Sequence, residues 1–187
     1  MLRKLIVQEM VSLDGYFAGP EGEIDWHRAD EDYVAYAGLF LQSVDLLLFG
    51  RVTYELMAAF WPTAKHELAS VMNEREKIVF SKRLVSANWR HTRLVSHDAC
   101  EEIKRLKREA GQDMAVLGSG LLASSLLRAG LVDEMQLTVV PIILGHGIPL
   151  FRNIHPQVPL QLVHTESYLS GNVLLRYRII GGDRDGS

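Results

Sequence analysis

The pattern that most constrains this chain is a repeated alternation between short apolar runs and segments with helical periodicity. Leu5–Val11 and Val44–Phe49 are rich in aliphatic and β-branched residues, which is typical of strands buried on both faces. Between them, apolar residues recur at helical spacing over 33–41, behind three acids at 30–32 that suit the positive end of a helix. Strand–helix–strand units of this kind form parallel sheets with right-handed crossovers.

The alternation continues to about residue 130, and strand-like runs then follow one another, with a hairpin turn expected at 170–172. We expect further helices over 51–60, 65–74, 99–110 (stopped by Gly111) and 121–129 (stopped by Gly130), and further strands over 77–80, 93–96, 114–117, 135–143, 161–168 and 173–180. The predicted fold is therefore α/β, a mostly parallel central sheet flanked by helices and completed by antiparallel C-terminal strands. One domain is expected over 1–181, followed by a disordered tail at 182–187.

Composition narrows the possible classes of function. Cys100 is the only cysteine, which excludes intramolecular disulfides and metal sites built from several cysteines, and we expect no metal ion. A net charge of -3 without a clustered basic face gives no reason to expect a nucleic-acid partner. No run approaches the ~20 apolar residues of a membrane helix, and the start does not resemble a signal peptide. We expect a cytoplasmic protein that binds a small molecule and does not bind membranes.

Three predicted strands end in residues suited to bind phosphate. Gly50–Thr53 and Gly118–Leu121 each place glycine at the start of a helix, where free backbone N–H groups favour anions. Ser81 and Lys82 follow a third strand and add a hydroxyl and a cation. In open α/β sheets, ligands bind beyond the carboxyl ends of the strands, where all three junctions are expected.

Each junction has an ordinary explanation when taken alone. A glycine between a strand and a helix is usually only a turn, and Arg51 alone would be a surface charge. The third glycine of the Rossmann pattern is missing after Gly120. Ser81–Lys82 could be a solvated helix start. Three such junctions in one short sheet are the argument for a shared site.

Several short motifs occur in order along nearly the whole chain. They lie at 10–16 (MVSLDGY), 50–55 (GRVTYE), 80–82 (FSK), 117–121 (LGSGL), 132–134 (VDE) and 141–151 (PIILGHGIPLF). By these motifs the chain resembles the dihydrofolate-reductase-like superfamily, specifically stand-alone proteins similar to the C-terminal reductase domain of the bifunctional riboflavin-biosynthesis deaminase-reductase. The His-x-Glu and Pro-Cys-x-x-Cys motifs of the zinc deaminase half are absent.

The resemblance implies an NADPH-dependent reductase of a small pterin-like or pyrimidine-like heterocycle, similar to 5-amino-6-(5-phosphoribosylamino)uracil reductase. The residues that it assigns to the cofactor are Phe17 and Ala18 over the nicotinamide, Gly50, Arg51 and Thr53 at the adenosine and pyrophosphate, Ser81 and Lys82 with Arg51 at the 2′-phosphate, and Gly118, Ser119, Gly120 and Leu121 at the pyrophosphate and nicotinamide ribose. These 2′-phosphate contacts imply a preference for NADP over NAD. The family often has two adjacent glycines where this chain has Ser119 between glycines.

On the substrate side, folate-reducing relatives have a tryptophan followed by a carboxylate at the next helix start. Trp26 and then Asp30 have nearly this spacing, so the resemblance implies that both bind substrate and that Asp30 assists protonation. A carboxylate can bind the amidine edge of a heterocycle and favour its protonated form. An alternative is that Asp30 only caps the helix. Asp14 is the other acid expected near the substrate, and it too has an alternative role in shaping its turn.

Two other functions remain open on the sequence. The chain could be a dihydrofolate reductase proper, which would differ mainly in the substrate pocket. It could also be a non-catalytic module that retains the nucleotide pocket, because a fold alone does not establish activity. The resemblance also implies a homodimer.

Overall fold

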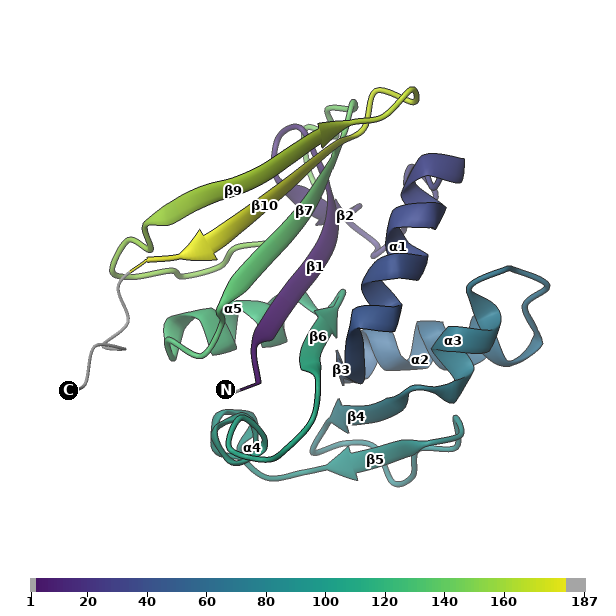
Figure 1. Cartoon of the computed structure of the whole chain (residues 1–187), viewed down its shortest axis with the longest axis vertical. Helices are drawn as coiled ribbons and strands as arrows, with labels where there is room; N and C mark the ends of the chain where they lie inside the picture. The colour runs from purple at the N-terminus through teal and green to yellow at the C-terminus, as the bar shows by residue number, and fades with distance from the viewer. Residues whose placement is uncertain (1–2, 181–187) are drawn as a thin grey trace.

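A computed structural model describes residues 3–180 and shows an α/β fold built around one large sheet (Figure 1). The predicted tail at 182–187 lies outside the described residues. The elements are β1 (Leu5–Ser12), β2 (Tyr16–Ala18), α1 (Glu31–Ser43), β3 (Val44–Gly50), α2 (Arg51–Phe60), the 3-10 turn η1 (Trp61–Thr63), α3 (Ala69–Glu74), β4 (Glu76–Phe80), β5 (Thr92–Val95), α4 (Ala99–Leu106), β6 (Asp113–Leu117), α5 (Gly120–Arg128), β7 (Glu134–Val140), β8 (Ile148–Pro149), β9 (Leu160–Ser167) and β10 (Val173–Ile179).

Eight strands form the main sheet in the order β5-β4-β3-β6-β1-β7-β10-β9. The first six are parallel, and β10 and β9 complete the sheet in antiparallel pairings. This arrangement confirms the predicted fold class. The structure adds a second, two-stranded sheet of β2 and β8 that the sequence analysis did not predict.

Helices cover both faces of the sheet (Figure 1). One apolar cluster joins the sheet to α4 and α5, and Leu5 and Val7 of β1 belong to it. A second cluster joins the sheet to α1 and α2, and Ile6 of β1 belongs to it. The strand β1 is therefore buried on both faces, as its largely apolar run predicted. Within residues 3–180, no helix is both long and apolar enough to cross a bilayer.

Two predicted elements are longer than the structure shows, for local reasons. The helix predicted at 65–74 begins only at Ala69, because the His66 ring accepts a hydrogen bond from the Leu68 N–H (3.1 Å) and holds the preceding residues in a turn. The strand predicted at 135–143 ends at Val140. Pro141 follows it and has no N–H to continue the pairing.

The predicted end of α4 is also wrong. The helix stops at Leu106 rather than continuing to Gly111, and Ala110 is exposed rather than directed inward. The chain leaves the helix early to enter β6 at Asp113. The predicted stop at Gly130 is confirmed, since it follows the C-cap of α5 with φ +66°.

Candidate functional site

The three predicted phosphate-binding junctions lie side by side at the carboxyl edge of the sheet. In the β3–β4 pairing, Gly50 stands opposite Phe80, so the residues that follow them, Arg51 and Ser81, leave neighbouring strands at the same level. The strand β6, which ends before Gly118, pairs with the other side of β3. Neighbouring strands are about 4.8 Å apart, so the junctions belong to one surface.

Ser119 connects two of these junctions. Its hydroxyl accepts a hydrogen bond from the Gly50 N–H (2.8 Å). The residue has left-handed backbone angles (φ 66°, ψ 50°) and is buried, so its side chain faces the neighbouring junction. The serine between the two glycines therefore joins α2 and α5 at their starts.

Glycine is required at two positions of the β6–α5 turn. A Cβ atom on Gly118 would lie 2.6 Å from Cγ2 of Thr53, and one on Gly120 would lie 2.6 Å from Cε1 of Phe17. The first turn of α2 and the Phe17 ring therefore pack directly on the backbone here. Leu121 is 69% exposed, and Ala18 is buried where β2 pairs with β8.

Both helix starts have free N–H groups. Neither Gly50 nor Ser119 caps its helix with a side-chain hydrogen bond. The first N–H groups of such a helix have no intrahelical partner and favour phosphate oxygens. The donor set therefore fits the pyrophosphate of a dinucleotide.

Arg51 and Ser81 keep their polar groups near the surface. The Arg51 guanidinium pairs with Glu55 one turn later (2.7 Å), and both side chains are partly exposed. The Ser81 hydroxyl accepts hydrogen bonds from the Arg83 and Leu84 N–H groups (3.0 Å each), which leaves its own hydrogen free to donate. Lys82 is exposed beside it.

The pairing between β1 and β6 stops within the sheet, and we call the region beyond this point the β1–β6 gap. Gln8 is opposite Leu117, the last residue of β6. The chain then turns away at Gly118, which has φ +61°. By contrast, β1 continues beside β7 as far as Ser12, opposite Val140. One side of β1 therefore has no neighbouring strand over its last residues.

The backbone of Met10 faces this gap. The Lys4 carbonyl accepts from Met114 on the β6 side, whereas the Leu5 carbonyl accepts from Asp133 on the β7 side. Because hydrogen bonds alternate between the two neighbours of a parallel strand, Met10 directs its N–H and C=O to the β6 side, as Lys4 does. Both groups therefore face the side of β1 that has no paired strand at this level.

Trp26 and His27 form the substrate-side loop. Their rings meet edge-on, with centroids 4.4 Å apart. Burial lowers the pKa of His27 to about 4, and the backbone of Phe17 partly offsets this shift. Among the described residues, neither Trp26 Nε1 nor His27 Nε2 has a hydrogen-bond partner although both atoms are buried. The loop therefore holds two unused polar groups next to the residue that covers Gly120.

Asp30 is the N-cap of α1, as one of the two interpretations expected. Its carboxylate accepts the Tyr33 N–H (2.8 Å). Desolvation raises its pKa, but hydrogen bonds from the Ser170 hydroxyl and from the Tyr33 and Ser170 backbones outweigh it, and the net pKa is lowered. Asp30 is thus held as a carboxylate. A carboxylate has several lone pairs, so it can cap the helix and still accept a hydrogen bond from a ligand.

Polar side chains line the α1 face of the sheet near Asp30. The Tyr33 hydroxyl accepts from Gln8 of β1 (3.0 Å), and the Tyr36 hydroxyl donates to Gln136 of β7. Burial raises the pKa of both tyrosines. The hydroxyls therefore remain protonated hydrogen-bonding groups at neutral pH.

Asp14 has the turn-shaping role that was the alternative in the sequence analysis. Its carboxylate is exposed and accepts the N–H groups of Leu144 (3.1 Å) and Gly145 (2.7 Å). Partial desolvation opposes these bonds and a hydrogen bond from Ser12, and its pKa is lowered overall. Asp14 fixes the loop after β7 to the turn after β1.

Two titratable groups near the site were not predicted from the sequence: the buried Glu9 and the half-buried His27. Glu9 is 5% exposed on β1, and burial raises its pKa well above its usual range. A charged residue within the largely apolar run at 5–11 is the signal that could have identified it. For His27, the only signal was its position next to Trp26.

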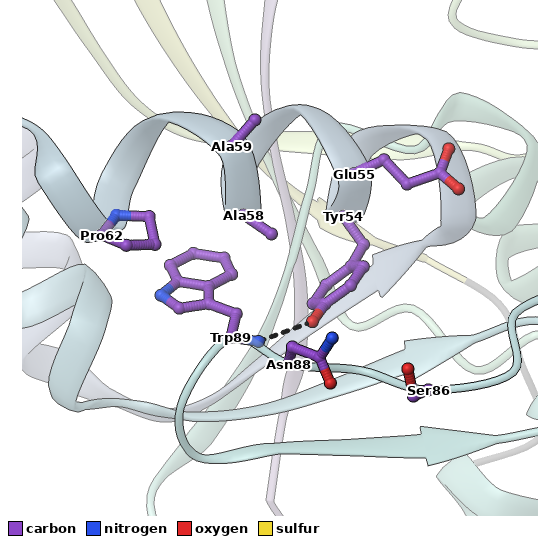
Figure 2. A pocket seen from close by; sticks show the side chains of 8 residues that line it. All are labelled: Tyr54, Glu55, Ala58, Ala59, Pro62, Ser86, Asn88 and Trp89. Atoms are coloured by element: carbon purple, nitrogen blue, oxygen red, sulfur yellow. Dashed lines mark hydrogen bonds between the residues drawn. The ribbon is translucent and has the colours of Figure 1, made fainter.

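A shallow groove of about 350 Å³ lies along α2, outside the predicted site (Figure 2). It is lined by Tyr54, Glu55, Ala58, Ala59, Pro62, Ser86, Asn88 and Trp89. The Tyr54 hydroxyl accepts a hydrogen bond from the backbone N–H of Trp89 (3.0 Å) within the groove. Glu55, the partner of Arg51, lies at one end, so the groove opens next to the β3–α2 junction.

Comparison with known proteins agrees with this architecture. The family model of the RibD C-terminal domain matches residues 3–174. The uncharacterized protein YyaP of Bacillus subtilis (strain 168) is 31% identical over 180 residues, which cover 94% of each chain.

Two solved structures show the same fold. A putative riboflavin biosynthesis protein from Shewanella sp. PV-4 superposes with a TM-score of 0.76 at 25% identity, over 96% of this chain and 99% of that one. Dihydrofolate reductase from Enterococcus faecalis, complexed with NADP(H), superposes with a TM-score of 0.68 at 18% identity, over 97% of this chain and all of that one. The family match and the shared architecture support a reductase with a dihydrofolate-reductase-like fold, and the chain belongs to the RibD C-terminal domain family.

Proposed function

We propose that this protein is an NADPH-dependent reductase of a pterin-like or pyrimidine-like heterocycle, similar to 5-amino-6-(5-phosphoribosylamino)uracil reductase. The observation that carries the proposal is the pair of uncapped helix starts joined by the Ser119–Gly50 hydrogen bond, next to the β1–β6 gap. Together they would form the surface that binds an elongated dinucleotide. Membership of the RibD C-terminal domain family supports it.

The proposed cofactor contacts follow the order of the strands. Arg51, Ser81 and Lys82 would bind the 2′-phosphate, with Thr53 at the adenosine side. The turn at 118–121 would hold the pyrophosphate and the nicotinamide ribose. The Arg51–Glu55 pair is exposed, and such pairs contribute roughly 0–1 kcal/mol, so a phosphate can displace Glu55 at little cost.

The nicotinamide end would enter the β1–β6 gap, under Phe17 and Ala18. NADPH supplies the hydride when bound, and the protein's task is to orient the two rings and exclude water. Trp26 and Asp30 would bind the heterocycle from the α1 side, with Asp14 fixing the adjacent loop. Because Asp30 is held as a carboxylate, it accepts hydrogen bonds from ring N–H groups and stabilises a protonated heterocycle.

The experiment that tests this function is a titration with NADPH and NADH, followed by quenching of tryptophan fluorescence. We expect the protein to bind NADPH more tightly than NADH. The Arg51→Ala variant should bind NADPH roughly 10- to 100-fold more weakly, the loss typical of a hydrogen bond to a charged group, with NADH affinity unchanged.

Arg108→Ala is the matched control, because Arg108 is an exposed arginine that follows α4, away from the three junctions. It should bind both cofactors as the wild type does. Equal affinities of the wild type for NADPH and NADH, or an Arg51→Ala variant with unchanged NADPH binding, would contradict the proposed 2′-phosphate site.

We also propose that the protein is a homodimer and acts in the cytoplasm. The strand β9 forms one edge of the main sheet, and all eight of its residues are exposed. Leu160, Leu162 and Val163 lie on it with 39–50% of their surface exposed. Exposed apolar side chains on an edge strand favour association, and a second copy of the chain is the proposed partner.

A further inference from the structure

Glu9 is an unexplained acid in the interior of the sheet. It is 5% exposed, and among the described residues its Oε1 has no hydrogen-bond partner. Leaving a polar group buried without a partner costs about 1–3 kcal/mol. Buried polar atoms almost always have a partner, so an unpaired one indicates a group that binds something else.

The position of Glu9 connects it to the β1–β6 gap. Gln8 is opposite Leu117, so Glu9 is level with Gly118, where β6 ends and the chain turns toward α5. Its side chain lies on the same face of β1 as Val7 and Val11, which belong to the cluster packed on α5. Glu9 thus borders the gap from the side of the uncapped start of α5.

A ligand at this point has to offer a polar group to the buried, unpaired Oε1 of Glu9. Burial raises the pKa of the Glu9 carboxyl and so favours its protonated form, which can both donate and accept a hydrogen bond. A phosphate does not need a carboxyl group as a partner, and the adjacent start of α5 already supplies N–H donors for a phosphate. A carboxamide, which has one acceptor oxygen and one NH₂ donor, matches the acid.

We propose that the Glu9 carboxyl is a ligand of the nicotinamide carboxamide of NADPH in the β1–β6 gap. This inference rests on the proposed function, since it needs the nicotinamide to enter the gap. The Met10 backbone supplies a second donor and acceptor at the same place. Glu9 therefore distinguishes the nicotinamide end of the cofactor from the phosphate end, which Arg51 and the turn at 118–121 bind.

The unpaired carboxyl of Glu9 is expected to lower the free energy of unfolding, which is the opposite of what a purely structural residue would do. Val7 and Val11, two positions away on the same face, are apolar and 0% and 6% exposed. Leucine at position 9 would match this surface and remove the unpaired group. Side chains that lower the stability of the folded state are typical of functional sites.

The test compares Glu9→Leu with the conservative variant Glu9→Gln, using NADPH and 2′-phospho-ADP-ribose, which lacks the nicotinamide. We expect Glu9→Leu to bind NADPH about 3- to 10-fold more weakly, the loss of one neutral hydrogen bond, and to bind 2′-phospho-ADP-ribose as the wild type does. Glu9→Gln should restore most of the NADPH affinity. In thermal denaturation without ligand, Glu9→Leu should have a higher Tm than the wild type.

The outcomes separate this inference from the proposed function. If the wild type binds neither ligand, both fail. If the wild type binds NADPH and Glu9→Leu binds it equally well, or binds both ligands equally weakly, only the role of Glu9 is overturned. If Glu9→Leu does not fold, Glu9→Ala replaces it, and unchanged NADPH affinity in that variant overturns the role in the same way.

Discussion

Gly118 is the residue on which the contact between the two helix starts most directly depends. Its φ of +61° is a conformation that costs an L-residue roughly 1–2 kcal/mol, and an added Cβ would also meet Thr53 at 2.6 Å. From the sequence, this glycine was expected only as part of a phosphate-binding helix start. In the structure the close approach is made by α2 itself, so Gly118 has a packing role as well.

Gly118→Ala should therefore lower both Tm and NADPH affinity, because the Cβ displaces the first turn of α2 from the cofactor site. Gly130→Ala is the matched control: Gly130 has nearly the same φ of +66°, and nothing lies within 4 Å of its added Cβ. The control should lower Tm through backbone strain alone and leave NADPH binding unchanged. Thermal denaturation measures the change in Tm, and fluorescence titration measures the change in NADPH affinity. If the Gly118→Ala and Gly130→Ala variants changed NADPH affinity by the same amount, the packing role of Gly118 would be contradicted.

Among the elements, α4 is stabilised by a buried acid. Glu102 is 4% exposed and binds Arg105 (2.9 Å) on its own helix and Arg93 (2.6 Å) on β5. Hydrogen bonds from Arg105, followed by those from Arg93 and His97, lower the pKa of Glu102 to about 2 against desolvation. This cluster attaches α4 to β5, the edge strand that pairs with β4.

Because the pKa of Glu102 is lowered in the folded state, the free energy of unfolding should fall as the pH becomes acidic. The folded pKa lies below the ordinary value of 4.5, so the stabilisation is fully present above about pH 4.5 and is lost as the pH falls toward 2. Glu102→Gln should lower the free energy of unfolding at pH 7 by roughly 2 kcal/mol and reduce the loss between pH 4.5 and 2. Urea denaturation across this range measures both quantities.

Glu101→Gln is the control for this prediction, since Glu101 is exposed and, within residues 3–180, its carboxylate forms an ion pair only with Lys104 of the same helix. It should change stability by less than about 1 kcal/mol. A Glu102→Gln variant with the same acid sensitivity as the wild type would show that the cluster does not contribute as proposed.

For the whole molecule, the proposed dimer makes a simple prediction. Leu162→Lys places a charge on the apolar edge strand β9 and should convert a dimer to a monomer in sedimentation velocity experiments. Val85→Lys is the control, because Val85 is 97% exposed on a loop far along the chain from β9. A wild type that sediments as a monomer, or a Leu162→Lys variant that remains dimeric, would contradict the β9 interface.

What the sequence by itself determined was local. The apolar run of β1, the acidic start of α1 and the glycine at each helix start predicted elements and junctions correctly, because periodicity and capping depend on residues a few positions apart. The errors were at element ends, where competing interactions such as the His66–Leu68 hydrogen bond or the proline after Val140 decide the boundary.

Only the tertiary structure decided which strands are neighbours and which polar groups remain unpaired. The β1–β6 gap exists because β6 ends opposite Gln8 while β1 continues beside β7, and these pairings join segments more than one hundred residues apart. The isolation of Glu9 and the hydrogen bond from Gly50 to Ser119 follow from the same arrangement. Hydrogen bonding is satisfied by the whole fold, so a residue without a partner can be recognised only when all its neighbours are in place.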